Sequence, residues 1–186
     1  MIRRHILSTV AALTGAAMAP TMAQASLVGD SVQILEFYPA IGVIYGSAGP
    51  QTIVAGGVTY TNVGQSLVNI TVDGSTATLA ASSPYTPSAA AFNGFDIQDL
   101  NLGRIITGVS IDTGSGPLPL NDLSFDAHNV YVNVENVPLS GATPIIIDIT
   151  SSLSGVPEPG AWTLMLIGFG GLGAVARRSR ASRTAT

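Results

Sequence analysis

The sequence contains no cysteine, and its 186 residues include no lysine. Without cysteine, the chain has no disulfide framework, no thiolate nucleophile and no cysteine-based zinc site. Charged residues make up 10 % of the chain, against roughly 25 % in an ordinary soluble domain. This low fraction excludes disorder through an excess of charge, and the lack of a basic patch excludes a nucleic-acid-binding protein.

The few charged residues follow a basic, acidic, basic order along the chain. Residues 1–25 carry two arginines and no acidic residue, and residues 157–186 carry four arginines against one glutamate. Between them, residues 26–156 carry ten acidic residues against the single Arg104, which is a net charge of −9. We therefore expect an acidic domain between two basic, apolar ends.

The N-terminus has the three parts of a secretory signal peptide. Two arginines are followed by an apolar stretch, and Ala23 and Ala25 then supply the small residues that signal peptidase accepts. The apolar stretch is shorter than the roughly 20 residues that a membrane span needs. We predict that signal peptidase removes residues 1–25, so that Ser26 begins an exported protein.

A second apolar run covers residues 161–176 and is followed by a basic cluster, Arg177, Arg178 and Arg180. As a helix this run would extend about 24 Å, somewhat less than a hydrocarbon core of roughly 30 Å. Arginines directly after such a run place the C-terminus in the cytoplasm. The sequence therefore predicts one C-terminal transmembrane helix followed by a basic tail.

The segment before this run contains Pro157, Glu158 and Pro159, with Trp162 three residues after the second proline. Together with the glycine-rich apolar span and the terminal arginines, these residues resemble the PEP-CTERM sorting signal, in its Pro-Glu-Pro-x-x-Trp subclass. The resemblance is limited to residues 157–186. It implies an exported protein of a Gram-negative bacterium that also makes extracellular polysaccharide.

In the PEP-CTERM family, an exosortase recognises the tripeptide and removes the helix. The resemblance implies a precursor anchored in the inner membrane, and a mature form at the outer cell surface or outside the cell. It names exosortase and signal peptidase as processing partners and leaves the extracellular polysaccharide open as a further one. Because many different domains carry this signal, it implies a destination and not an activity.

The region between the two signals is predicted to be all-β. It has no sustained 3.6-residue apolar period, and short β-rich runs alternate with turn residues instead. The predicted strands cover Ser31–Tyr38, Ile41–Tyr45, Val58–Asn62, Leu67–Val72, Thr76–Ala80, Phe92–Ile97, Arg104–Ile111, Leu123–Phe125, Asn129–Val134 and Ile145–Thr150. This pattern indicates a single antiparallel β-sandwich over residues 26–150, of a jelly-roll-like type. Residues 151–156 are assigned to a linker.

Two patterns resemble catalytic sites, and each has a structural interpretation as well. The Asp-Thr-Gly-Ser run at Asp112 resembles an aspartic protease signature, but that chemistry needs a second carboxylate, and Asp73 begins a turn without the threonine. His128 would serve as the base of a serine hydrolase beside Ser124 and Asp126, but alternation along a strand would place all three in a row. We therefore expect no catalysis.

Two kinds of binding site remain open. Calcium needs six to eight oxygen ligands, and two oxygen-rich groups of residues would offer some of them: Asp96, Asp99 and Asn101, and Asn121, Asp122 and Asp126. A neutral glycan could bind to exposed tyrosines among Tyr38, Tyr45, Tyr60, Tyr85 and Tyr131.

The expected function is structural or adhesive, in the envelope or the extracellular matrix, with no cofactor. A carbohydrate- or calcium-binding surface module is the first alternative, and an extracellular hydrolase is the second.

Overall fold

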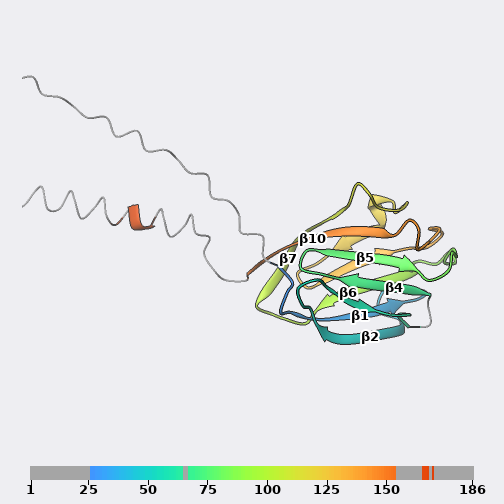
Figure 1. Cartoon of the computed structure of the whole chain (residues 1–186), viewed down its shortest axis with the longest axis horizontal. Helices are drawn as coiled ribbons and strands as arrows, with labels where there is room; N and C mark the ends of the chain where they lie inside the picture. The colour runs from blue at the N-terminus through green and yellow to red at the C-terminus, as the bar shows by residue number, and fades with distance from the viewer. Residues whose placement is uncertain (1–25, 65–66, 154–164, 168, 170–186) are drawn as a thin grey trace, which may run out of the picture. The chain divides into compact units, whose positions relative to one another are not determined.

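In a computed structural model, the residues described are 26–64, 67–153, 165–167 and 169. Residues 23–156 form one compact unit, which contains every described strand (Figure 1). The described residues of the second unit are 165–167 and 169, which are helical. Most of the transmembrane helix predicted over 161–176 lies outside the described residues. Within the described part of the chain, no helix is long and apolar enough to cross a membrane.

The domain consists of ten strands and one short 3-10 helix. They are β1 (Ser31–Phe37), β2 (Ile44–Thr52), β3 (Val58–Tyr60), β4 (Val68–Val72), β5 (Thr76–Ala81), β6 (Gly94–Asp99), β7 (Arg104–Ile111), η1 (Leu120–Asp122), β8 (Leu123–Phe125), β9 (Asn129–Asn133) and β10 (Ile145–Leu153).

The strands form two five-stranded sheets. One sheet has the order β2-β1-β6-β9-β8 and the other the order β3-β4-β5-β10-β7. Every pair of neighbouring strands in these sheets is antiparallel. The prediction of an all-β, antiparallel domain is therefore confirmed.

Both sheets bury alternate side chains in one hydrophobic core. Val32 and Ile34 of β1 are buried from one sheet, and Ile145, Ile147 and Ile149 of β10 are buried from the other. All five belong to a single cluster of contacting apolar residues. Because successive side chains of a strand point to opposite faces, this spacing of two directs one face of each sheet into the core.

β2 differs most from its prediction. We predicted a strand over Ile41–Tyr45, but β2 begins at Ile44 and continues to Thr52, and residues 38–43 form the turn before it. β2 is an edge strand that pairs with β1 alone, and the register of this pair shifts twice. An edge strand tolerates the Gly49-Pro50 dipeptide because its outer N–H groups face solvent.

β10 is longer than predicted, so the assignment of residues 151–153 to the linker is wrong. The register of β10 against β7 shifts between Thr150 and Ser151, and pairing then continues to Leu153. Ser151 is 3 % exposed. A small-residue segment resembles a linker in composition, but the same small side chains fit a packed strand once a neighbouring strand is available for pairing.

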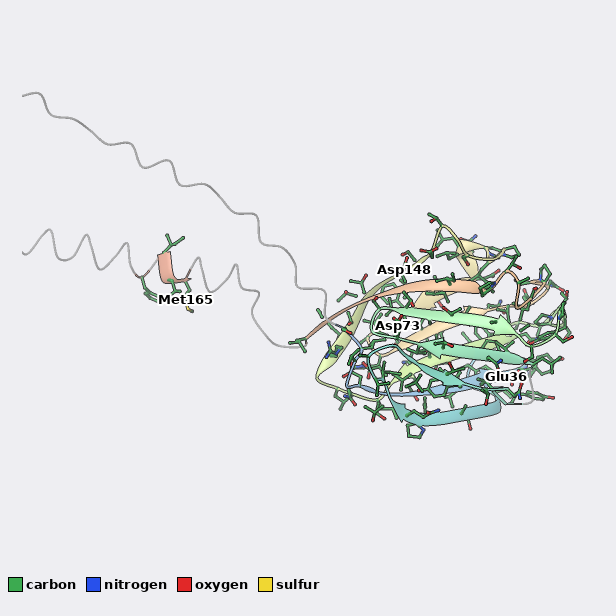
Figure 2. The ribbon with its side chains drawn as sticks, viewed as in Figure 1. Glu36, Asp73, Asp148 and Met165 are labelled. Atoms are coloured by element: carbon green, nitrogen blue, oxygen red, sulfur yellow. The ribbon has the colours of Figure 1, made fainter. Side chains whose placement is uncertain are left out.

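The chain enters and leaves the domain at the same end. Near its start, the Leu27 N–H donates to the carbonyl of Gly74, in the turn between β4 and β5 (2.7 Å). β10 ends at Leu153, which pairs with the first residue of β7, Arg104. β1 ends at Phe37, at the opposite end of the domain, where Phe37 pairs with Gly94 of β6. In Figure 2, Glu36 accordingly lies toward the end of the domain away from the end of β10.

Candidate functional site

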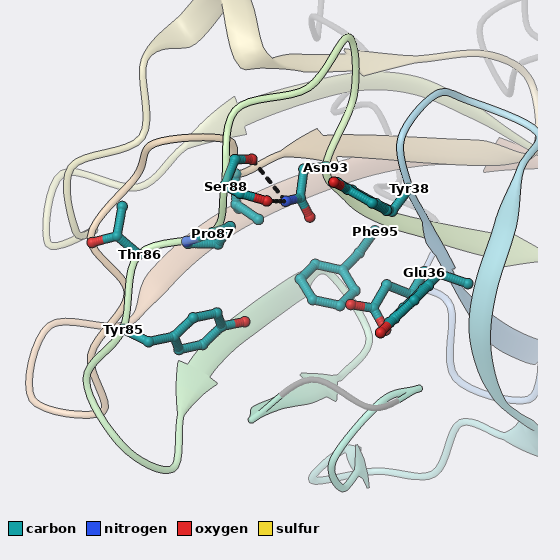
Figure 3. Close-up of a pocket in the computed structure, with 10 residues that line it drawn as sticks. Glu36, Tyr38, Tyr85, Thr86, Pro87, Ser88, Asn93 and Phe95 are labelled. Atoms are coloured by element: carbon teal, nitrogen blue, oxygen red, sulfur yellow. Dashed lines mark hydrogen bonds between the residues drawn. The ribbon is translucent and has the colours of Figure 1, made fainter.

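A pocket of about 390 Å³ opens at the end of the domain opposite to the end of β10 (Figure 3). Its walls come from the ends of β1 and β9, the beginnings of β2 and β6, and the loop between β5 and β6. The lining residues are Glu36, Tyr38, Tyr45, Tyr85, Thr86, Pro87, Ser88, Asn93, Phe95 and Val134.

Three tyrosines contribute to the lining. Tyr38 and Tyr45 lie on the two sides of the turn between β1 and β2, and their rings meet edge to face with centroids 6.0 Å apart. They are 37 % and 51 % exposed, so both rings are accessible to a ligand. Tyr85 comes from the loop between β5 and β6, and its backbone exchanges two hydrogen bonds with Leu139 (3.2 and 2.8 Å). Those bonds hold the third ring in place.

A buried carboxylate, Glu36, lies among these rings. It occupies a core-facing position of β1, opposite Phe95 of β6, and is 7 % exposed. Two glycines make room for it: the space that a side chain at Gly64 would need is taken by the Glu36 carboxylate, and Gly46 approaches Gly64 too closely to carry a side chain. Gly64 also has φ +62°, a left-handed conformation that glycine adopts without strain.

The polar wall of the pocket is fixed by hydrogen bonds. The Asn93 side-chain amide donates to the carbonyl of Ser88 (2.9 Å), as Figure 3 shows. The Asn93 backbone N–H donates to Oδ1 of Asn133 (3.0 Å), and the Ala90 N–H donates to the carboxylate of Glu135 (2.9 Å). The loop that carries Tyr85 is therefore hydrogen-bonded to the end of β9 and to the segment that follows it.

This combination suits a small polar molecule that has one apolar face. Binding pockets generally pair aromatic walls with a few polar groups that fix the orientation of the ligand. Sugars have this character, because the C–H groups of a pyranose form an apolar face and its hydroxyls project at the rim. A carboxylate accepts hydrogen bonds from such hydroxyls, and an amide can both donate and accept.

The two other tyrosines considered from the sequence lie elsewhere. Tyr60 is 1 % exposed in the core, where its hydroxyl donates to the carbonyl of Val32 (2.7 Å), and burial raises its pKa to about 12. Tyr131 lies on the outer face of β9 and donates to Asp126 (3.1 Å). Three of the five tyrosines thus meet in the pocket, although Tyr85 follows Tyr45 by 40 residues in the sequence.

Sequence reasoning missed Glu36 and Asn93 as pocket residues. One signal was present for Glu36: it continues the alternation of Val32 and Ile34, so a carboxylate stands where an apolar core residue is expected. Asn93 gave no such signal, because Asn-Gly is also an ordinary turn sequence.

A second polar cluster lies at the end of the domain where β10 ends. Arg104 and Asp30 form an ion pair of 2.6 Å, and the Asn101 side chain donates to Asp30 (3.0 Å). The Asn101 N–H donates to Asp99 (2.9 Å), whose pKa is raised above its usual range, mainly by burial. This network joins the start of the domain to the turn between β6 and β7.

The aspartates of the two protease-like patterns stabilise turns. Asp112 accepts a hydrogen bond from the Gly114 N–H (2.6 Å), and Asp73 accepts from Ser75 and Thr76 (both 2.8 Å). The structure does not bring these two carboxylates together, because Asp112 follows the end of β7 away from Arg104 whereas Asp73 lies in the turn between β4 and β5.

The hydrolase-like group is also arranged as a turn. Asp126 accepts hydrogen bonds from the backbone N–H of His128 (2.8 Å) and from Asn129, but none from the His128 ring. A base oriented by an acid would need its ring nitrogen at that carboxylate.

The first calcium group is divided between the two faces of β6. Asp99 lies opposite Val32 on the core-facing side, whereas Asp96 lies between Leu35 and Tyr131 on the outer face. Considering the described residues only, no group of three or more histidine, aspartate or glutamate side chains could hold a metal ion. Asp96 and Asp99, which the sequence left open as ligands of a common calcium ion, are therefore not brought together.

Asp96 and Asp126 have opposite pKa shifts. Asp96 is 3 % exposed, and burial together with the nearby Asp126 charge raises its pKa to about 7. Burial also acts to raise the pKa of Asp126, but hydrogen bonds from His128, Asn129 and Tyr131 outweigh it and lower the pKa. The pKa of Tyr131 rises to about 12 through burial and its bond to Asp126.

Residues 155–181 match the family described as the PEP-CTERM protein-sorting motif. The match implies exosortase-dependent export, membrane-associated sorting and surface localisation, as the sequence predicted. Neither the curated proteins nor the solved structures gave any match. The predicted processing residues Ala23, Ala25, Pro157, Glu158, Pro159, Trp162, Arg177, Arg178 and Arg180 lie outside the described residues, and Ser26 is the first described residue.

Proposed function

We propose that the β domain is a glycan-binding module, displayed on the cell surface by its sorting signal. The observation that carries this proposal is the meeting of Tyr38, Tyr45 and Tyr85 around the buried Glu36 carboxylate. The structural or adhesive role expected from the sequence would then act through carbohydrate binding, and the extracellular polysaccharide is the natural ligand.

The charge of the domain favours a neutral glycan. Ten acidic residues against one arginine give residues 26–156 a net charge of −9. The single Arg104 is paired with Asp30 at the opposite end of the domain from the pocket. The pocket lining therefore offers Glu36 as its charged group and no cation, so an acidic polysaccharide would be repelled.

The composition of the pocket supports binding and not hydrolysis. Glycoside hydrolysis ordinarily needs two carboxyl groups on either side of the bond to be broken. The described lining contains one, Glu36. We accordingly propose that the protein is not an enzyme.

The remaining features of the precursor belong to the same proposal. They are a cleaved signal peptide over residues 1–25, a transmembrane helix over 161–176, and a sorting motif of the subclass marked by Trp162. The domain itself is proposed to be a jelly-roll-like sandwich, since two antiparallel sheets enclose one core. The position of the pocket supports this display, because it lies opposite to the end at which the chain leaves toward the membrane.

The test is a glycan array probed with the full-length chain, followed by calorimetry with the best neutral oligosaccharide. We expect binding that is unchanged by EDTA and that falls at least tenfold, about 1.4 kcal/mol, in Tyr45→Ala. Tyr131→Ala is the matched control, because it removes a tyrosine from the outer face of β9. Equal losses in both variants, or an array without binding, would contradict the proposal. Loss of binding with EDTA would point to a calcium-dependent site.

A further inference from the structure

Three leucines are exposed at the end of the domain where β10 ends. Leu100 and Leu102 belong to the turn between β6 and β7 and are 40 % and 78 % exposed, and Leu153, the last residue of β10, is 51 % exposed. All three line one shallow hollow of about 450 Å³, so they are neighbours in space. We call this surface the leucine end. A single exposed leucine is ordinary on a soluble protein, but a group of them marks an interaction surface.

The polar groups of this hollow neutralise one another. Arg104 and Asp30 form an ion pair of 2.6 Å, and the side-chain amide of Asn101 donates to Asp30 at 3.0 Å. No other charged side chain lines the hollow as the structure describes it. The lining of the leucine end therefore carries no net charge, unlike the domain as a whole, and it offers little attraction to a charged partner.

The covalent chain keeps the leucine end near the C-terminal apolar run. Only residues 154–160 separate Leu153 from Ala161, where that run begins. A fully extended chain spans at most 3.3–3.6 Å per residue, so Leu153 lies within about 29 Å of the apolar run. Along the covalent chain, the leucine end is the part of the domain that directly precedes this run. A membrane that holds residues 161–176 therefore lies within reach of the leucine end.

We infer that the leucine end rests on the headgroup region of the lipid bilayer that holds the precursor. This inference rests on the membrane anchoring proposed above. Leu102, at the tip of its turn, inserts its side chain at the boundary of headgroups and acyl chains, and Leu100 and Leu153 flank it. Apolar side chains bind that boundary through the apolar area that they bury, and basic residues add attraction to anionic lipids. The contact would orient the domain so that the tyrosine-lined pocket points away from the membrane.

The absence of cysteine from the chain gives a direct test. Leu102→Cys in the full-length chain provides a single site for a nitroxide spin label, and the labelled protein is reconstituted into phosphatidylethanolamine and phosphatidylglycerol vesicles. Leu120→Cys is the matched control, because Leu120 is 68 % exposed and lies in η1, outside the hollow. For the label at 102, we expect the collision rate with a water-soluble nickel chelate to fall at least threefold and the collision rate with oxygen to rise. The label at 120 should remain as accessible as in solution.

Each other outcome contradicts the inference in a distinguishable way. A label at 102 that stays as accessible to the chelate as the label at 120, while the chain floats with the vesicles, overturns the inference alone. A chain that does not float with the vesicles overturns the proposed anchoring as well. Shielding at 102 that appears only when exosortase is added would assign the leucine end to contact with the enzyme. Shielding that appears only at high protein concentration without vesicles would assign it to contact with a second copy of the chain.

Discussion

At the scale of single residues, buried carboxylates distinguish this domain from an ordinary β protein. Glu36 and Asp96 are both nearly fully buried, at 7 % and 3 % exposed. Burying a charged carboxylate is costly, so such a group either finds partners or takes up a proton. Glu36 lies among the tyrosines of the pocket, whereas Asp96 lies beside Tyr131 on the outer face of the same sheet. The second case has a measurable consequence for stability.

Asp96 should make the protein less stable as the pH rises from about 4 to 7. Its pKa is about 7 in the folded protein and 3.8 in an ordinary environment, so in this range the folded state binds the extra proton. The free energy of unfolding therefore falls with rising pH, by up to roughly 4 kcal/mol for a shift of this size. Asp96→Asn, which is neutral at every pH, should remove this dependence and be more stable than the wild type at pH 8.

Urea unfolding of both proteins at pH 5 and pH 8 measures this difference. Asp73→Asn is the control, because the pKa of Asp73 is lowered and its turn joins β4 and β5 of the other sheet. The stability that the charged Asp73 carboxylate contributes is present above the ordinary aspartate pKa of 3.8 and is lost as the pH falls through its lowered folded-state pKa, so this variant should lose stability equally at pH 5 and pH 8. A difference between wild type and Asp96→Asn that is the same at pH 5 and pH 8 would show that Asp96 does not carry the proton.

At the scale of secondary structure, the sequence predicted every strand but not every boundary. Strands with one buried face, such as β4 and β9, are visible because their apolar and polar residues alternate. β2 and the end of β10 were misjudged for a common reason. Their glycine, proline and serine residues have low β propensity, and they are strands because β1 and β7 offer them partners. The pocket was less predictable still, because the turn between β1 and β2, which carries Tyr38 and Tyr45, meets Tyr85 from the loop between β5 and β6 only in the folded domain.

The end of β10 should respond to charge as a buried strand and not as a linker. Ser151 is 3 % exposed and paired with Ile106, whereas its neighbour Thr150 is exposed. Ser151→Asp buries a charge and should lower the free energy of unfolding by about 2–4 kcal/mol. Thr150→Asp, the adjacent control, should cost less than about 1 kcal/mol. Both variants are measured by thermal and urea unfolding. Small and similar decreases in the free energy of unfolding would show that residue 151 belongs to the linker and not to a packed strand.

At the scale of the whole molecule, the two proposed contact surfaces lie at opposite ends of the domain. The tyrosine-lined pocket lies at one end, and the leucine end and the exit of the chain lie at the other. Under the proposed function, this separation would let the domain bind a glycan without interference from whatever holds or processes its C-terminus. It also places the sorting motif close to a folded strand, since Pro157 is four residues after Leu153. A processing enzyme must therefore reach a site within about 14 Å of the domain.

Mass spectrometry of the mature protein from a sorting-competent host tests this arrangement. We expect the loss of residues 1–25 and of the segment after Pro159, and the same protein from a host without exosortase should keep its C-terminus. Deletion of residues 154–156 should slow C-terminal processing severalfold, because it brings the motif against the end of β10, which is paired with β7 up to Leu153. Insertion of three glycine or serine residues at the same place should leave processing unchanged. If the deletion is processed as fast as the wild type, the enzyme does not need the spacing that the fold provides.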